Sequence, residues 1–432
     1  MDEVILLNPD ADGTPRQGAH GSGAVQLSHG GAPHDNDAPV NPECLYCANP
    51  CGAGSSLSFG IEPGIDVPAN EGKVIAAMSG GVDSSVACAL LHEAGFEVIG
   101  VTMRLFDYDQ LANAELEAMN QSCCSQKDVE DARSVCWSMG LDHFAFNFTD
   151  RFEADVMDKF CKSYLVGETP NPCIDCNRFL KFTALQRRRG QLEYDYVATG
   201  HYVRRAYDKE TGRYLLKKGL DPKKDQSYVL YGMTQDQLKH TLFPLGELTK
   251  EATREIARRH GFTTAEKAES QDICFVPDGD YAAFIQKHEG SLPCGGPIVL
   301  EDGTVVGQHI GLVHYTPGQR KGLGVAWSEP LYVLSKDIPN NTLVVGPASS
   351  QHVSKLWADD VNLISVENLP HPTAVTVKVN YRAKEVPALA QMKKGELVVE
   401  FLEPIRTCAT GQAVVLYQGD LVVGGGTIRR YE

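Results

Sequence analysis

A short apolar segment, a turn rich in serine and glycine, and then a helix-like pattern most constrain how this chain can fold. Residues 73–78 read KVIAAM, which is typical of a buried strand. The turn at 79–85 reads SGGVDSS, and apolar residues then recur at helical spacing up to Gly95, a residue type that favours a helix C-terminus. A strand, a glycine turn and a helix in this order present backbone N–H groups at the positive end of the helix dipole. The turn is therefore expected to bind an anion such as phosphate.

The residues of the turn indicate which ligands this anion site would bind. Glycines let the backbone approach a phosphate closely, and the hydroxyl groups of Ser79, Ser84 and Ser85 add donors. Asp83 does not favour phosphate by itself, so its presence indicates an accompanying Mg²⁺. The turn matches neither GxxxxGKS/T nor GxGxxG, which argues against binding of the kind found in P-loop kinases and dinucleotide dehydrogenases. The alternative interpretation is a turn that only caps the helix.

Strands and helices are expected to alternate after this turn. The expected strands are 97–103, 144–148 and 196–199, and the expected helices are 128–140, 152–166, 179–189, 249–261 and 281–288. This alternation predicts a parallel, doubly wound sheet with helices on both faces. From about residue 297 short strands become frequent, and Val375, Val377 and Val379 share one face of a later strand. Evenly spaced short strands favour a small barrel.

These patterns predict a multidomain α/β chain. A parallel, doubly wound domain that contains the glycine-rich turn would span 73–278, a small α+β central domain 279–347 and a C-terminal β-barrel 348–432. Residues 1–72 contain 19 Gly and Pro residues, ten acids and one base, a composition that predicts a disordered extension.

The extension also accounts for much of the acidic charge. It carries −9 of the formal net charge of −16, so the charge of the whole chain does not exclude a nucleic-acid partner for the remainder. The extension holds three closely spaced cysteines that would suit a metal ion, although a tail of unligated thiols is the alternative. They are Cys44, Cys47 and Cys51.

Several features bear on the cellular compartment. No apolar run approaches the ~18–20 residues of a membrane span, and the N-terminal residues lack the basic and apolar regions of a secretory signal. Thirteen cysteines without such a signal indicate a reducing compartment, here the cytoplasm. There, cysteines more often bind metals or take part in catalysis than form disulfide scaffolds.

Two later segments carry cysteines that could do chemistry. Residues 169–177 read TPNPCIDCN, in which two prolines are expected to stiffen a loop ahead of a helix. Cys176 would then lie near the helix N-terminus, where the pKa of a thiol falls. Residues 269–275 read ESQDICF and contain Cys274, 98 residues after Cys176. Sequence alone does not show that Cys176 and Cys274 lie close together. The alternative interpretation is that each cysteine is a small buried hydrophobic residue without a chemical role.

The order of these motifs resembles a known enzyme family. SGGVDSS is similar to the signature of the N-type ATP pyrophosphatases, which cleave ATP between the α and β phosphates. Together with TPNPxxxCN and a later CF, it resembles the bacterial tRNA-specific 2-thiouridylase family. Further agreement lies in GHY at 200–202, KDQSY at 224–228, FPLGEL at 243–248, GQRKGLG at 318–324 and GGG at 424–426. The resemblance runs from about Lys73 to the C-terminus and leaves residues 1–72 uncovered.

The resemblance implies roles for individual residues. ATP would be held by Ala77, Met78, Ser79, Gly80, Gly81, Val82, Asp83 and Ser84, with Met103 and Gly200 near the adenosine. The target uracil would be bordered by Asn171, Pro172 and Cys173. The nucleophile would be Cys176, and the persulfide sulfur would be carried by Cys274. The tRNA would be contacted by His201, Lys224, Asp225, Gln226, Asn380, Tyr381 and Gln412.

The implied reaction is ATP-dependent thiolation of the wobble uridine of tRNA. Transfer of AMP to O2 would make that oxygen a leaving group, with Mg²⁺ and backbone amides offsetting the charge on pyrophosphate. Sulfur on Cys274 would then attack C2 directly, or Cys176 would free it as sulfide and leave a Cys176–Cys274 disulfide to be reduced. The base would leave the anticodon stack to reach the pocket. Implied partners are the lysine, glutamate and glutamine tRNAs and a persulfide donor, either a cysteine desulfurase or a relay protein.

One residue departs from the family pattern. Many members have Asp after the Asn-Pro pair, where this chain has Cys173. The change creates a Cys173-x-x-Cys176 pair with Cys274 as a third ligand, a set suited to a [4Fe–4S] cluster with one open iron. A persulfide relay and a cluster mechanism are therefore both open. The remaining clustered cysteines are expected to be structural; they are Cys123, Cys124 and Cys136.

Two other functions are open besides thiolation. Another adenylating enzyme with the same loop, such as an amide-forming synthetase, would leave the paired cysteines unexplained. A non-catalytic nucleotide- or metal-binding module is suggested by the cysteines of the extension. Clustered basic residues favour a tRNA partner, with a solvated helix face as the alternative; they are Arg178, Lys181, Arg187, Arg188, Arg189, Arg320 and Lys321.

Overall fold

The computed structural model of the 432-residue chain describes residues 4–5, 72–105, 125–267, 273–276 and 279–432. Some predictions concern residues outside this described part. They are the disorder of the extension, its metal site at Cys44, Cys47 and Cys51, the structural role of Cys123 and Cys124, and the first residues of the 269–275 motif.

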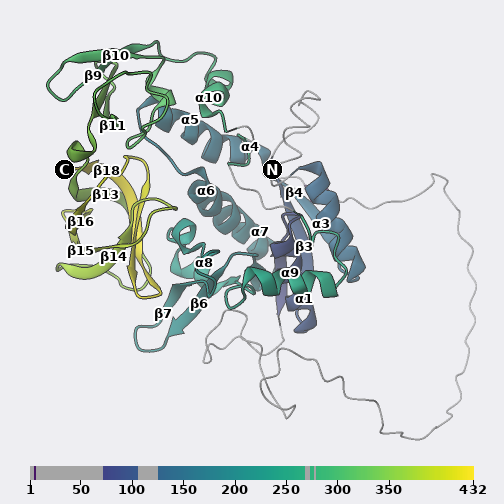
Figure 1. Cartoon of the computed structure of the whole chain (residues 1–432). Helices are drawn as coiled ribbons and strands as arrows, with labels where there is room; N and C mark the ends of the chain where they lie inside the picture. Colours follow the sequence, from purple (N-terminus) through teal and green to yellow (C-terminus); the bar gives the residue numbers. More distant parts are fainter. Residues whose placement is uncertain (1–3, 6–71, 106–124, 268–272, 277–278) are drawn as a thin grey trace, which may run out of the picture. The chain divides into compact units, whose positions relative to one another are not determined.

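A six-stranded sheet forms the core of the first part of the chain (Figure 1). Its spatial order is β1 (Val4–Ile5), β4 (His143–Asn147), β3 (Glu97–Arg104), β2 (Lys73–Ala77), β5 (Tyr196–Ala198) and β8 (Thr241–Leu242). Neighbouring strands run parallel, except that β1 is antiparallel to β4. The chain moves outward from β2 in both directions, as in a doubly wound sheet, so the prediction for this part is confirmed.

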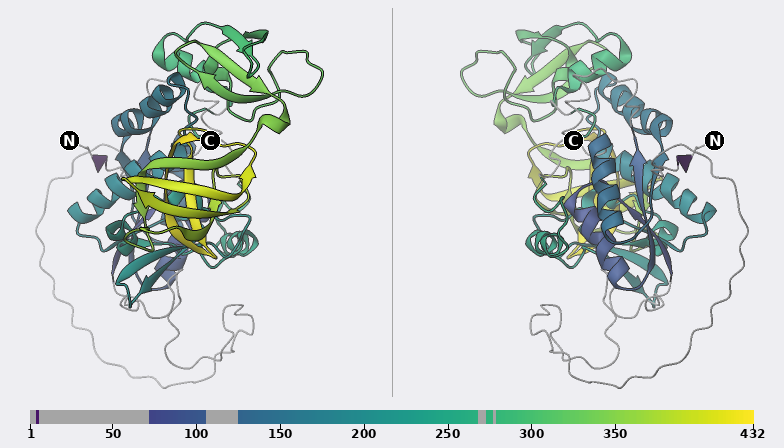
Figure 2. Two further views of the ribbon diagram at one scale, coloured as in Figure 1. Left: turned by 90° about the vertical axis from the view of Figure 1, so that its left-hand side faces the viewer. Right: turned by 90° about the vertical axis from the view of Figure 1, so that its right-hand side faces the viewer.

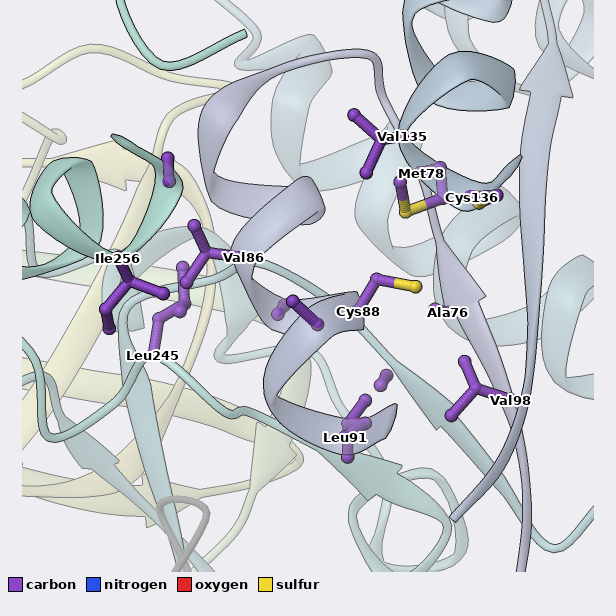
Figure 3. Packing of buried hydrophobic residues seen from close by; sticks show 14 of the residues in the cluster. Ala76, Met78, Val86, Cys88, Leu91, Val98, Val135, Cys136, Leu245 and Ile256 are labelled. Atoms are coloured by element: carbon purple, nitrogen blue, oxygen red, sulfur yellow. The ribbon is translucent and has the colours of Figure 1, made fainter. Parts of the chain in front are cut away.

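Helices cover both faces of this sheet. On one face lie α1 (Val82–Glu93), α3 (Gln126–Ser138) and α9 (Lys250–Arg259), whose apolar side chains pack with Val74 and Ala76 of β2 (Figure 3). On the other face α4 (Thr149–Phe152), α5 (Asp158–Leu165) and α7 (Leu185–Gln191) pack with Ile75 of the same strand. Successive side chains of a strand point to opposite faces, so β2 contributes to both cores.

The segment between β4 and β5 contains two π-helical stretches, η2 (Glu153–Met157) and η3 (Cys176–Ala184). Because η3 continues α6 (Pro172–Asp175), the helix predicted to begin at residue 179 begins instead at Pro172. Proline suits this first helical position, since it has no N–H and an N–H there would have no acceptor within the helix. The Asn171 side chain accepts a hydrogen bond from the Cys173 N–H at 3.1 Å. The prediction of a loop over the proline motif was wrong in part: the motif is itself a helix start.

The C-terminal part is a closed six-stranded barrel, drawn in yellow and yellow-green in Figure 2. Its strands follow the order β13 (Val353–Leu363), β16 (Glu396–Ile405), β15 (Val386–Lys393), β14 (Thr373–Lys378), β17 (Ala413–Gln418) and β18 (Leu421–Tyr431), and β13 also pairs with β18. The valines predicted to share a face, Val375, Val377 and Val379, are all buried in the barrel core. The predicted barrel is confirmed.

A hairpin from the first part of the chain joins the barrel sheet. β6 (Val203–Asp208) and β7 (Arg213–Lys218) follow β5, and β7 pairs with β18. η4 (Ser227–Leu230) and α8 (Gln235–Lys239) come next. One buried cluster combines Leu216 and Tyr228 of this region with Val415, Tyr417 and Val422 of the barrel. Neither the hairpin nor this shared core was predicted from the sequence.

The central part is a small α+β unit, as predicted. α10 (Tyr281–Glu289) precedes a four-stranded sheet in the order β10 (Val305–His309), β9 (Gly296–Val299), β12 (Thr342–Gly346) and β11 (Tyr332–Asp337). Short 3₁₀ turns are η5 (Leu312–His314) and η6 (Ala348–Ser350). Every helix in the described part of the chain falls short of the length and apolarity that a membrane span requires.

Candidate active site

The phosphate loop joins β2 to α1 and is braced by its own serines. The Ser79 N–H donates to the Ser84 hydroxyl at 3.1 Å, while the Ser84 and Ser85 hydroxyls donate to the Gly81 carbonyl at 3.1 and 2.9 Å. Gly81 is the N-cap of α1, and no side chain caps the first helical N–H groups. These N–H groups and the helix dipole therefore face the loop as an anion site.

Two glycines let other elements pack against this loop. Gly80 has a φ of +67°, and a Cβ there would lie 2.3 Å from the carbonyl oxygen of Asp128 in α3. A Cβ on Gly200, just after β5, would lie 2.8 Å from the Asp83 carbonyl carbon and from the Ser84 nitrogen. A larger residue at either position would displace the loop backbone. Gly200, predicted to lie near the adenosine, thus contacts the loop.

Lys250 contacts the loop and was not predicted. Its amine donates to both carboxylate oxygens of Asp83 at 2.7 Å, and the Tyr202 hydroxyl donates to one of them at 2.8 Å. Lys250 is the first residue of α9, where the helix dipole disfavours a cation, and its side chain is only 7% exposed. A lysine directly after the N-cap Thr249 was therefore the signal that could have identified it.

Lys267 is a second cation at the loop that was not predicted from the sequence. Its amine donates to the Gly80 carbonyl at 2.9 Å and to the Asp128 and Asp131 carboxylates at 2.5 and 2.6 Å. Burial works to lower the pKa of Lys267, but the hydrogen bonds to the two aspartates outweigh it and raise that pKa above its usual value. The loop is thus bordered by two charged amines drawn from distant parts of the chain.

The helix start formed by α6 and η3 carries Cys173 and Cys176 three residues apart. Cys173 is exposed and Cys176 is partly exposed. Asp175 is buried with its carboxylate 2.5 Å from the Lys159 amine; burial raises the pKa of Asp175, although Lys159 opposes the rise. Because the helix delivers the chain to the beginning of β5, its own start lies toward the carboxyl edge of the sheet, as the phosphate loop does.

Cys274 lies in a turn that aromatic side chains hold in place. The Val276 N–H donates to the Ile273 carbonyl at 2.9 Å. Phe275 is buried, and its ring centroid lies 5.0 to 5.7 Å from those of Phe152, Phe160 and Phe284. Cys176 and Cys274 both pack against a large buried core that includes these rings and extends from Ile75 of β2 to Ile285 of α10. The two cysteines thus border the same core, although 98 residues separate them in the chain.

Several predicted tRNA contacts gather around Tyr381, which is 41% exposed. Partial burial raises the pKa of Tyr381, Asp225 and Cys173 add to the rise, and Lys224 opposes it, so these three groups lie within electrostatic reach of the phenol. Lys378 places an amine 5.6 Å from the ring centroid. A residue predicted to border the uracil and residues predicted to contact tRNA thus share one region.

Three predicted tRNA contacts make hydrogen bonds within the protein or are buried in it. The Asp225 carboxylate accepts from the Ser227 N–H at 3.1 Å, and the Gln226 side-chain oxygen accepts from the Tyr202 N–H at 3.0 Å. His201 is buried, and burial lowers its pKa well below the usual value, so its ring carries no charge. Asp225 and Gln226 shape their own loop, and His201 does not present a cation to a phosphate.

A barrel loop contacts the beginning of the proline motif. The Thr169 N–H donates to the Thr410 carbonyl at 2.8 Å, and a Cβ on Gly411 would lie only 2.7 Å from the Glu168 Cβ. Gln412, a predicted tRNA contact, follows in the same loop. A cavity of about 60 Å³ adjoins this contact, with Asn171, Asp175 and Arg429 among its lining residues.

Comparisons with known proteins bear on the family. Family models match residues 72–278 as a tRNA methyl transferase HUP domain, 282–347 as a tRNA methyl transferase PRC-barrel domain and 353–428 as an aminomethyltransferase beta-barrel domain. The tRNA-specific 2-thiouridylase MnmA of Moorella thermoacetica is 52% identical over 353 residues, which cover 82% of this chain and 98% of that protein. The chain belongs to the tRNA-specific 2-thiouridylase family.

Two further 2-thiouridylases agree. The enzyme of Heliobacterium modesticaldum is 47% identical, and the match spans 83% of this chain and 92% of that protein. The enzyme of Acetivibrio thermocellus is 46% identical, and the match spans 83% of this chain and 99% of that protein. The resemblance drawn from the motifs is confirmed. The family models begin at residue 72, so the residues before it lie outside their matches.

In this chain, part of the predicted basic face serves internal contacts. Arg178 of η3 donates to both carboxylate oxygens of Asp360 on β13, and Arg189 of α7 donates to the Tyr194 and Asp195 carbonyls. These two arginines hold elements together. Met103, predicted near the adenosine, is buried on β3.

Potential metal ligands also lie away from the phosphate loop. Among the described residues, one group of three donor atoms lies within 4.8 Å of one another, and it comprises Cys161, His288 and Glu289. The three cysteines predicted as cluster ligands do not form such a single-ion group. The ligand sulfurs of a four-iron cluster stand farther apart because the cluster lies between them, so the cluster hypothesis stays a prediction.

Proposed function

We propose that this chain is an ATP-dependent tRNA uridine 2-sulfurtransferase that converts the wobble uridine of tRNA to 2-thiouridine. Family membership over 98% of the length of a 2-thiouridylase carries the proposal. It also implies the use of ATP with Mg²⁺. The packing of Cys176 and Cys274 on one cluster gives further support, because a synthetase with the same loop would have no use for them.

Adenylation would use the phosphate loop and its two lysines. The first N–H groups of α1 and the amines of Lys250 and Lys267 would offset the charge on the departing pyrophosphate. Asp83 is 32% exposed and a carboxylate has about four acceptor positions, so it fits a Mg²⁺ in addition to Lys250. Mg²⁺ would supply further charge neutralisation. The uracil O2 would attack the α phosphorus, pyrophosphate would leave, and O2 would become part of an AMP leaving group.

Sulfur transfer would use a persulfide on Cys274. In one route the terminal sulfur attacks C2 and AMP leaves; the Cys176 thiolate then attacks the Cys274 sulfur and releases the thiolated base. In the other route Cys176 attacks first and frees hydrosulfide, which attacks C2. Both routes leave a Cys176–Cys274 disulfide, which an external thiol must reduce before the next turnover.

Cys173 offers a second means to the same product. Three cysteine thiolates would hold a [4Fe–4S] cluster, which would supply an open iron position for sulfide. The donor set fits in its chemistry, since Cys173 and Cys176 are three residues apart on one helix and both reach the surface. In the relay mechanism Cys173 would instead line the uracil pocket, beside Asn171 and Pro172.

The partners follow from the reaction and from the family resemblance. The substrates would be the lysine, glutamate and glutamine tRNAs, contacted around Tyr381, and the persulfide would come from a cysteine desulfurase or a relay protein in the cytoplasm. We divide the chain into the extension 1–72, the catalytic domain 73–278, the central domain 279–347 and the barrel 348–432. The ranges matched by the family models support this division.

The test is tRNA-dependent chemistry by the full-length chain purified without oxygen. With ATP, Mg²⁺, a persulfide donor and tRNA, we expect 2-thiouridine and pyrophosphate, and no pyrophosphate release without tRNA. Cys176→Ala and Cys274→Ala should abolish thiolation, whereas Cys408→Ala, at a buried cysteine of the barrel, should retain it. Thiolation that survives in Cys274→Ala, or pyrophosphate release that ignores tRNA, would refute the proposal.

Iron content separates the two sulfur routes. The parent protein for this measurement has serine in place of Cys44, Cys47 and Cys51, so that iron bound by the extension does not add to the iron content. The cluster route would be assigned if the parent protein contains near-stoichiometric iron and acid-labile sulfide, and if Cys173→Ala loses both the iron and the thiolation activity. The persulfide relay would be assigned if iron-free protein thiolates tRNA and if Cys173→Ala retains that activity.

A further inference from the structure

A group of potential metal ligands lies between α5 and α10, outside the residues assigned to ATP, sulfur or tRNA. Cys161 is on α5, whereas His288 and Glu289 are the last two residues of α10. The Cys161 sulfur, a ring nitrogen of His288 and a carboxylate oxygen of Glu289 all lie within 4.8 Å of one another. Three donors of three kinds thus converge from two helices.

The surroundings fix the orientation of the histidine. The Asp158 carboxylate lies one turn before Cys161 and is 2.8 Å from the His288 Nε2, and its other oxygen accepts from the Lys162 amine at 3.1 Å. The Phe284 ring stacks on the imidazole at 5.9 Å between centroids. With Asp158 on Nε2, a metal would bind Nδ1, and a carboxylate on the opposite ring nitrogen is the usual outer partner of a metal-binding histidine.

The donor set is suited to one kind of cation. Thiolate, imidazole and carboxylate together are ligands of zinc, whereas Mg²⁺ and Ca²⁺ prefer oxygen alone. The local charge agrees, since Asp158, Glu289 and a Cys161 thiolate would all contribute negative charge, which Lys162 offsets in part. Cys161 is buried and Glu289 is exposed, so one side of the group is open to solvent for entry of an ion.

We propose that Cys161, His288 and Glu289 bind one Zn²⁺, with a water as the fourth ligand and Asp158 orienting His288. The ion would join α5, in the catalytic part, to α10, which precedes the central sheet. It would therefore stabilise the junction of these two parts and would take no part in the chemistry of thiolation. The site stands independently of the proposed function.

The test is zinc binding by the full-length chain in which Cys44, Cys47 and Cys51 are serine. Chelator-stripped protein is titrated anaerobically with Zn²⁺ against a competing chromogenic chelator, and with Co²⁺ to observe a thiolate-to-metal charge-transfer band. We expect Cys161→Ser to bind one equivalent fewer than its parent, and His288→Gln to bind at least about tenfold more weakly. The matched control Cys408→Ser, at another buried cysteine, should bind as the parent does.

Thermal unfolding gives a second readout. Zn²⁺ should raise the unfolding midpoint of the parent and of Cys408→Ser, because an ion that binds only the folded state stabilises it, and should leave Cys161→Ser and His288→Gln unmoved. Equal zinc stoichiometry in the parent and Cys161→Ser, or an equal midpoint shift in His288→Gln, would overturn the proposal. In that case the group is a hydrogen-bonded contact between two helices.

Discussion

Gly80 lies where the phosphate loop turns against α3, and it tolerates no side chain there. Its φ is +67°, and a Cβ would lie 2.3 Å from the Asp128 carbonyl oxygen, which is backbone and cannot rotate away. We therefore expect Gly80→Ala to destabilise the protein by about 3 kcal/mol or more and to abolish tRNA-dependent pyrophosphate release. Urea unfolding and a pyrophosphate assay measure the two effects.

Gly140 supplies the matched control for this prediction. It also has a left-handed φ, of +72°, but nothing lies within 4 Å of an added Cβ. Gly140→Ala should therefore cost only the ~1–2 kcal/mol of the backbone conformation and retain activity. If the two variants lose the same stability, the contact with Asp128 is not what requires glycine in the loop.

His143 gives the protein a pH dependence at acidic pH. Burial, and then Arg133, lowers the pKa of His143 to about 4, and its Nε2 lies 2.9 Å from the Thr102 hydroxyl. An unfolded histidine takes up its proton near pH ~6.5, so the unfolded state binds more protons between the two values and stability falls as the pH drops through that window. We expect a loss of about 2–3 kcal/mol between pH ~7.5 and ~4.5 by urea unfolding. His143→Gln should reduce this loss; a variant as acid-sensitive as the wild type would contradict the assignment.

At the scale of elements, Lys250 and Asp83 tie α9 to the start of α1. The Lys250 side chain is 7% exposed, and its removal leaves the partly buried Asp83 carboxylate without its cation, although the hydrogen bond from the Tyr202 hydroxyl remains. We expect Lys250→Met to destabilise by about 1–3 kcal/mol and to slow pyrophosphate release at least about tenfold. Lys209→Met, at an exposed turn, should do neither.

A double variant separates the two roles of Lys250. Asp83→Asn added to Lys250→Met removes the uncompensated charge and should restore much of the stability. Activity should stay low, because the double variant lacks both the cation beside the phosphates and the carboxylate proposed to hold Mg²⁺. Recovery of activity together with stability would contradict a role of Lys250 and Asp83 in adenylation.

The elements also show what could be predicted from the sequence. The strand, turn and helix around SGGVDSS were predictable because their pattern is continuous in the chain. The β6–β7 hairpin was missed because its strand sequences, VRRAYD and RYLLKK, mix charge into both faces and its barrel partner β18 lies some 200 residues later. The cysteines were found by their motifs, whereas Lys250 and Lys267 reach the loop only through the tertiary fold.

At the scale of the whole molecule, the barrel and the catalytic part share a core. Leu216 and Tyr228 are packed in one cluster with Val415 and Tyr417, and all four are buried. We expect Tyr417→Ala to lower stability by about 3–5 kcal/mol, and the catalytic part and the barrel to unfold in a single calorimetric transition. Leu402→Ala, at a barrel residue that is 63% exposed, should change little. Two separate transitions in the wild type would contradict the shared core.

The shared core has a genetic consequence. A search for alleles that lose 2-thiouridine would recover barrel substitutions, for example at Val415, together with substitutions at Cys176. The two classes would differ in the cell: barrel alleles would lower the amount of the protein and be temperature-sensitive, because unfolded chains are degraded, whereas cysteine alleles would leave its abundance unchanged.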